Sequence, residues 1–160
     1  MSQKPKIGDI FQVPIDALSF GYFQYITNDS TQLNSQVVRV FRGRYSQDES
    51  TDIARVSSEE AEFHAHVFLT VGIKQLLWRK IGHKGVAAKP DVLFRDTNDF
   101  GNPKVKVSRD WHVWKVNEPS RSVGTLELRY QHAEIGVVVP PDSLVCRMRQ
   151  GSYDFAYPDF

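Results

Sequence analysis

Three runs of β-branched and aromatic residues lie close together near the start of this chain. They read DIFQVPI at 9–15, FGYFQYI at 20–26 and QVVRVF at 36–41, and short polar connectors separate them. Apolar runs of this length, either alternating with polar residues or nearly unbroken, are typical of β-strands that are joined by turns. The spacing therefore predicts an antiparallel meander. Pro14 predicts a sheet edge at that point, because proline donates no hydrogen bond to a neighbouring strand.

The rest of the chain keeps this preference for sheet. Valine, isoleucine, phenylalanine, tyrosine and tryptophan together number 45, whereas alanine, leucine and methionine number 19. The first group favours strands and the second favours helices. Further strands are predicted at 64–71, 76–82, 104–107, 111–116, 125–130 and 135–139. We expect one domain over residues 1–160 that is α+β but mainly β: an antiparallel twisted sheet or a partly open barrel with a few short helices.

Helix signals are limited to three places. Ser57 and Glu60 fit a capping box, which predicts a short helix that starts there. A second turn of helix is expected at 72–77. The third helix is predicted at 141–148, because proline suits its first position and Gly151 suits its end.

The strand patterns also predict which side chains are buried. Trp111 and Trp114 fall on opposite faces of one strand, so we expect one of the two to be exposed. The alternation at 125–130 places its leucines on one face. The predicted core includes Phe11, Val38, Val40, Trp78, Leu126 and Leu128.

Charge is balanced over the whole chain but not along it. Lysine and arginine number 20 and the acidic residues 19, which argues against a dedicated nucleic-acid binder. Six acidic residues lie between 48 and 62, and five basic residues with no acidic one lie between 74 and 89. These stretches are either solvent-exposed surfaces that pair weakly with each other or charged surfaces that bind a partner of opposite charge. The polar start of the chain and the lack of a long apolar run predict a cytoplasmic protein without a membrane span.

The residues offer little for catalysis. His64 and His66 lie two apart in a predicted strand, which would place both imidazoles on one face, as in some metal sites. No third candidate ligand follows at a spacing that is characteristic of metal sites. The chain also contains neither a nucleophile motif nor a phosphate-binding loop. Cys146 lacks the local signature of a reactive thiol. We therefore expect no enzyme activity, no metal and no cofactor. A small metal-dependent hydrolase that uses His64 and His66 stays as an alternative.

Several of these runs resemble a known family. The segments 6–15, 20–26 and 37–41, the WRKIG element at 78–82, Trp111 and the closing 145–151 are similar to the Imm26-type immunity proteins of bacterial polymorphic toxin systems. The resemblance implies a small cytoplasmic antitoxin that binds and neutralises the C-terminal domain of a cognate toxin, including toxins of contact-dependent growth inhibition. It implies no catalytic residues. An SH3-like or barrel-type module that binds RNA or a ribosomal partner is the second hypothesis.

Two segments are candidates for contact with a toxin. Nucleases carry basic clefts, and clustered carboxylates would fit such a cleft and speed association, although direct binding of nucleic acid by this chain is not expected. The tail at 151–160 is rich in aromatic and acidic residues, so it should dock either on its own domain or on a partner. Lys74, Arg79, Lys80 and Lys84 are the alternative surface if the toxin is acidic. The predicted contact residues are Asp48, Glu49, Asp52, Glu59, Glu60, Tyr153, Asp154, Tyr157 and Asp159.

Overall fold

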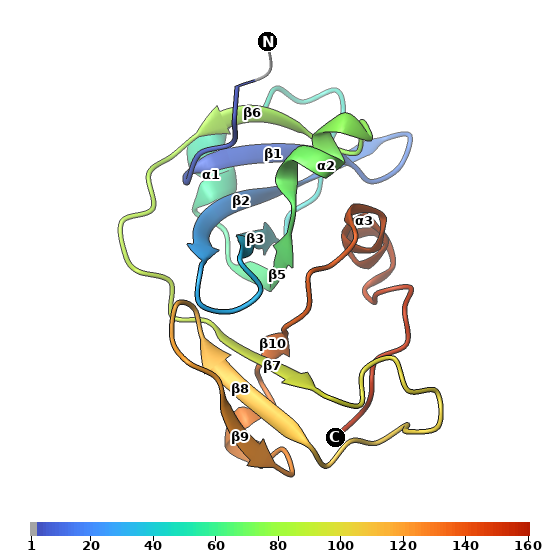
Figure 1. Ribbon diagram of the computed structural model, residues 1–160. Helices are drawn as coiled ribbons and strands as arrows, with labels where there is room; N and C mark the ends of the chain where they lie inside the picture. Colours follow the sequence, from blue (N-terminus) through green and yellow to red (C-terminus); the bar gives the residue numbers. More distant parts are fainter. Residues whose placement is uncertain (1–2) are drawn as a thin grey trace.

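A computed structural model describes residues 3–160 and confirms the mainly β fold (Figure 1). Ten strands form two open sheets in which antiparallel pairing dominates, and no closed barrel is present in this part of the chain. Figure 1 shows the smaller sheet below the larger one, with the third helix and the C-terminal tail at one side. None of the helices in the described range has the length and apolar character needed to cross a membrane.

The larger sheet contains the predicted meander. Its strands are β1 (Asp9–Pro14), β2 (Ser19–Asp29), β3 (Ser35–Phe41), β4 (Tyr45–Ser46), β5 (Ala61–Val67) and β6 (Arg79–His83). They lie in the order β5-β3-β2-β1-β6, with β4 paired to β2, and all neighbours are antiparallel. β1 is therefore not an edge strand along its length. β6 pairs only with Asp9–Gln12, however, so Pro14 lies beyond the last paired residue on that side.

The smaller sheet follows in the second half of the chain. Its strands are β7 (Leu93–Thr97), β8 (Trp111–Lys115), β9 (Arg121–Gly124) and β10 (Glu134–Ile135), in the order β10-β7-β8-β9. Only β10 and β7 run parallel. The segment at 104–107, predicted as a strand, lies outside the named strands, and only Val107 forms an isolated bridge, with Asp159.

The helices are short: α1 (Ile53–Ser57), α2 (Leu69–Lys74) and α3 (Pro141–Gln150), with a 3₁₀ turn η1 (Leu128–Tyr130). The predicted α3 is confirmed, and Gly151 ends it with a φ of 87°. The capping-box prediction was wrong, because α1 is capped by Asp52 and ends where the box was expected to begin. The predicted strand at 125–130 was also wrong, since Leu126 lies outside any named element and Leu128 begins η1.

Most of the predicted core is buried. Phe11, Val38, Val40, Trp78 and Leu126 are all at most 3% exposed. Leu128 is 82% exposed, because the chain leaves the extended conformation and begins η1 at this residue, so Leu126 and Leu128 do not share a face as they would in a strand. The expectation of one exposed tryptophan was likewise wrong: Trp111 and Trp114 are 0% and 3% exposed, so β8 is covered on both faces.

A fully buried polar cluster joins the two sheets. Asp29, at the end of β2, accepts hydrogen bonds from His66 Nε2 at 2.9 Å and from Trp114 Nε1 at 3.0 Å, and also one from the backbone N–H of Asn117. Asp29 and His66 are both 0% exposed. Burial alone would raise the pKa of Asp29, but these hydrogen bonds outweigh it and hold that pKa below its ordinary value. Burial also lowers the pKa of His66, against the opposing effect of Asp29.

Candidate functional site

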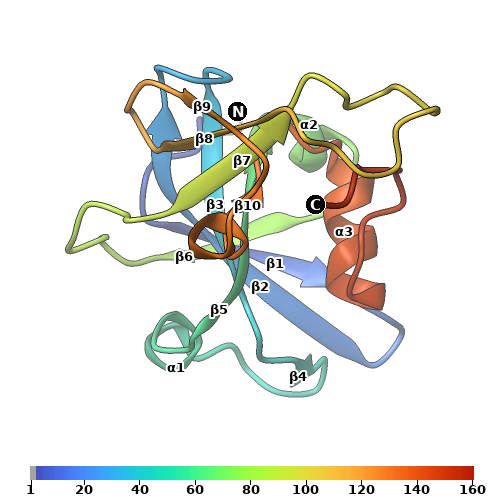
Figure 2. The same ribbon diagram turned by 90° about the horizontal axis from the view of Figure 1, so that it is seen from below.

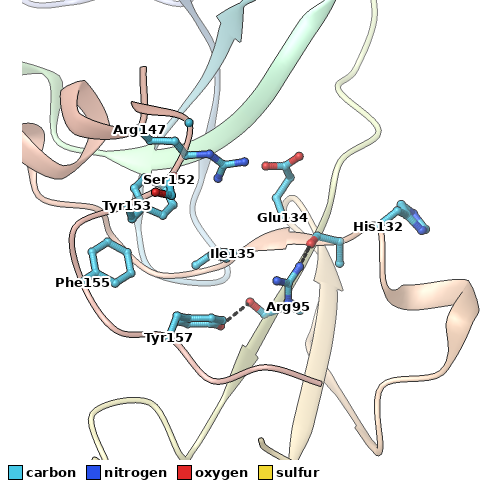
Figure 3. A pocket seen from close by; sticks show the side chains of 11 residues that line it. Arg95, His132, Glu134, Ile135, Arg147, Ser152, Tyr153, Phe155 and Tyr157 are labelled. Carbon is cyan, nitrogen blue, oxygen red and sulfur yellow. Dashed lines mark hydrogen bonds between the residues drawn. The ribbon is translucent and has the colours of Figure 1, made fainter. Parts of the chain in front are cut away.

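A hollow of about 400 Å³ lies where the smaller sheet, α3 and the C-terminal tail meet (Figure 3). Arg95 reaches it from β7, Glu134 from β10 and Arg147 from α3. Tyr153 and Tyr157 close it from the tail. Figure 3 shows the guanidinium of Arg147 directed toward the carboxylate of Glu134, with Arg95 on the other side of β10.

Aromatic rings hold the two arginines in place. The guanidinium of Arg147 lies 3.9 Å from the ring centroid of Phe63 and 4.8 Å from that of Tyr153. Arg95 lies over the rings of Trp111 and Tyr157 and donates to the carbonyl of Ala133. Rings that pack against a guanidinium restrict its motion without neutralising its charge. The hollow therefore contains two fixed cations.

Polar groups in the hollow keep unused hydrogen-bonding capacity. Arg95 Nε and the hydroxyl of Tyr153 are buried and have no hydrogen-bond partner. Glu134 accepts from the backbone N–H of His64 at 3.0 Å, and among the ion pairs of residues 3–160 none joins it to either arginine. Burial raises the pKa of Glu134, against the opposing effects of that N–H and of Arg147 and Arg95. Burial also raises the pKa of Tyr153 to about 12, so its hydroxyl stays a donor.

Two further hollows, each about 430 Å³, continue from the first. The middle one shares His132 and Glu134 with the first hollow, and it shares His64 with the third. The middle and third hollows are both lined by His64 of β5, the edge strand of the larger sheet, and Figure 2 shows α1 and α3 on opposite sides of that strand. We call these three joined hollows the seam groove. Its charged lining residues are Arg39, Lys84, Lys89, Asp91, Arg95, Lys115, Arg121, Arg129, Glu134 and Arg147.

The predicted acidic contact residues all lie in the segment of the chain between β4 and β5. Asp48, Glu49, Asp52 and Glu60 are exposed, and Asp52 also caps α1 by accepting from the N–H of Arg55 at 3.2 Å. Glu59 is half-buried: it accepts from the N–H of Gly43 at 2.8 Å and from the hydroxyl of Tyr45. We call the four exposed carboxylates the acidic surface; Glu59 instead holds the chain between β3 and β4.

The predicted tail residues turn toward the protein. Tyr153 and Tyr157 line the first hollow. Asp154 accepts from the hydroxyl of Ser143 at 2.6 Å, which ties the tail to α3. The backbone of Asp159 bonds to Lys106 and Ser108 at 2.8 and 2.9 Å. The tail thus docks on its own chain, which was one of the two expected outcomes, and its rings form part of the site.

The predicted basic residues separate in the structure. Arg79 donates to Gln12 and Lys80 pairs with Asp9 at 3.0 Å, while the side chain of Lys74 is exposed. Lys84 alone of the four lines the seam groove. The arginines of the groove were missed by sequence reasoning, because they come from segments that lie far apart in the sequence.

The two histidines of the metal hypothesis have different surroundings. His66 is fully buried, and its Nε2 bonds to Asp29. His64 lines the seam groove, and burial together with the charge of Arg39 lowers its pKa to about 4. In residues 3–160, no three histidine, cysteine, aspartate or glutamate side chains gather as a metal site would require.

Comparison with known families decides the relationship of this chain. The model of one family, Immunity protein 26, matches residues 6–103. The chain belongs to the Immunity protein 26 family. The match runs from the residues just before β1 through β7, and so includes the opening meander and the WRKIG element on which the resemblance rested. No curated protein and no solved structure matches the chain.

Membership in the Immunity protein 26 family confirms the resemblance seen in the sequence. The matched part contains four of the eight cations of the seam groove, namely Arg39, Lys84, Lys89 and Arg95. It also contains the whole acidic surface. The acidic surface therefore lies wholly in the matched part, whereas the other four groove cations, Lys115, Arg121, Arg129 and Arg147, lie beyond it.

Proposed function

We propose that this protein is an antitoxin that neutralises the C-terminal domain of a cognate toxin by stoichiometric binding, without catalysis. The observation that carries the proposal is the family match over residues 6–103. We further propose that it acts in the cytoplasm of a bacterium with a polymorphic toxin or contact-dependent inhibition system, as one immunity domain without a cofactor.

We propose a nuclease as the toxin and the acidic surface as a contact for its basic cleft. Asp48, Glu49, Asp52 and Glu60 are exposed on adjoining loops, where they can approach a cationic partner without rearrangement. Such charge complementarity chiefly speeds association, and it weakens as salt screens the charges. Glu59 is left out of this contact, because its carboxylate is used inside the protein.

The test uses the toxin domain encoded beside this gene. Purified protein should bind that domain one to one and protect cells that express it. The variant Glu60→Lys should slow association and reduce its dependence on salt, whereas Glu118→Lys, an exposed carboxylate elsewhere, should change neither. A variant that still binds the toxin domain with unchanged affinity but no longer protects cells would contradict stoichiometric neutralisation. Unchanged association after reversal of all four carboxylates would remove the acidic surface as the contact.

A further inference from the structure

The seam groove contains a much larger fraction of the chain's basic residues than of its acidic residues. Eight of the 20 lysines and arginines line it, against two of the 19 acidic residues, in a chain whose net charge is only +1. Both acids, Asp91 and Glu134, lie among these cations. A concave surface with one dominant sign of charge focuses its field and attracts a partner of the opposite sign.

The first hollow adds a specific chemistry to this field. Arg95 and Arg147 are fixed by rings on either side of Glu134, and the Nε of Arg95 and the hydroxyl of Tyr153 still lack acceptors. A planar guanidinium binds carboxylates through two parallel hydrogen bonds. Buried donors without partners are costly, so an acceptor that reaches them gains the bonds at little further cost in ordering. A carboxylate on a short side chain has the shape and charge for this position.

The groove suits an acidic polypeptide better than a nucleic acid. Binding of single strands usually needs open aromatic faces on which bases stack. Here the ring of Tyr153 lies against Phe155, with centroids 4.8 Å apart, and its other contacts are with Arg147 and Phe63. The ring of Tyr153 is therefore already covered by its neighbours and offers no open face for a base.

We propose that the seam groove binds an acidic segment of the toxin, with one aspartate or glutamate side chain in the hollow between Arg95 and Arg147. This inference rests on the proposed function for the identity of the partner. Ser57, at the end of α1, lines the far hollow, and Glu60 of the acidic surface follows it three residues later along the chain. A toxin that contacts both surfaces would present a cationic and an anionic region side by side, and would bind in one orientation.

The first experiment needs no toxin. A fluorescein-labelled oligoglutamate peptide, an oligolysine peptide of equal length and a single-stranded oligouridylate are titrated with the protein at low salt. Oligoglutamate should bind, oligolysine should not, and oligouridylate should bind more weakly. The paired changes Arg95→Gln and Arg147→Gln should weaken oligoglutamate binding about tenfold or more. Arg42→Gln with Arg109→Gln, which removes two exposed arginines outside the groove, should leave it nearly unchanged.

A second variant tests the groove at exposed residues, in case the arginine variant fails to fold. Lys84 and Lys89 are exposed, and no side-chain hydrogen bond or ion pair of either is found in the described structure, so changing both to Glu tests the groove without disturbing the core. This variant should also weaken oligoglutamate binding. Equal binding by all folded variants, or stronger binding of oligouridylate than of oligoglutamate, would overturn the inference.

The same variants then separate the inference from the proposed function. If the wild type protects cells from the neighbouring toxin and the groove variants bind toxin more weakly, both stand. If the groove variants lose oligoglutamate but still bind toxin with full affinity, the groove is not the toxin contact and the inference fails alone. If wild type binds no toxin, the proposed function fails, while the peptide titration still decides whether the groove accepts carboxylates.

Discussion

Replacing Asp29 by Ala should be among the most destabilising single changes in this protein. Its carboxylate is 0% exposed and accepts from His66 on β5 and Trp114 on β8, so it joins the two sheets through a single side chain. Alanine would leave both buried donors without an acceptor. Each buried donor left unpaired costs about 1–3 kcal/mol, and breaking a buried charged pair costs about 3–5 kcal/mol. We therefore expect Asp29→Ala to lower the free energy of unfolding by about 3–5 kcal/mol.

Asparagine separates the charge of Asp29 from its shape. Asp29→Asn keeps one oxygen acceptor, so we expect a smaller loss of about 1–3 kcal/mol, from the missing charge and the second acceptor. The matched control is Asp48→Ala, an exposed carboxylate whose removal should change stability by at most about 0.5 kcal/mol. Urea denaturation near neutral pH, followed by tryptophan fluorescence and by far-ultraviolet circular dichroism, measures all three.

Two results would refute the reasoning about Asp29. A loss below about 1 kcal/mol in Asp29→Ala would mean that water or other groups satisfy His66 and Trp114 once the carboxylate is gone. Additive losses in Asp29→Ala, His66→Ala and the double variant would show that the two side chains act independently. Contacting residues in one hydrogen-bond network should instead show a coupling energy of about 0.5–3 kcal/mol.

Three further predictions concern the core and pH. Trp78→Ala should cost about 3–5 kcal/mol in urea denaturation, because the ring is 3% exposed and its Nε1 donates to Leu69. Gly72→Ala should also destabilise, since the added Cβ would lie 1.9 Å from the Trp78 ring; a neutral effect would contradict this packing. Stability should fall as pH drops from about 6.5 toward 4, because the pKa of His64 is about 4 in the folded protein and the unfolded chain takes up that proton first. His64→Gln should flatten this part of the pH profile, by up to about 3 kcal/mol at its acid end.

The elements that could be predicted from sequence are those with strong local patterns. The β1–β3 meander and α3 combine an apolar run with turn residues, a starting proline or a closing glycine, so neighbouring residues alone determine them. The stretch at 125–130 alternates equally well but forms a turn and η1, where Leu126 is buried and Leu128 is not. Alternation can arise by chance over a few residues, and tertiary packing then decides the backbone.

The candidate site shows the same division between local and distant information. The acidic surface could be predicted because its residues are close together in sequence. The seam groove could not, because Arg39, His64, Arg95 and Arg147 come from four elements that meet only after both sheets have formed. The aromatic tail was the one signal that pointed to the first hollow, although sequence alone did not show which way its rings face.

The segregation of charge bears directly on how an immunity protein selects its partner. Uniformly mixed charge with a net of +1 would give little long-range preference, and a strongly acidic or basic protein would attract every partner of opposite sign. This chain has exposed carboxylates in the segment around α1 and cations in the seam groove, which Ser57 at the end of α1 also lines. A partner that complements only one surface meets like charge at the other, which costs affinity. If a toxin contacts both surfaces, as proposed, reversing the charge of one surface should reduce discrimination between toxins. It should reduce affinity for a single toxin less at high salt, where screening leaves the contacts in the first hollow to dominate.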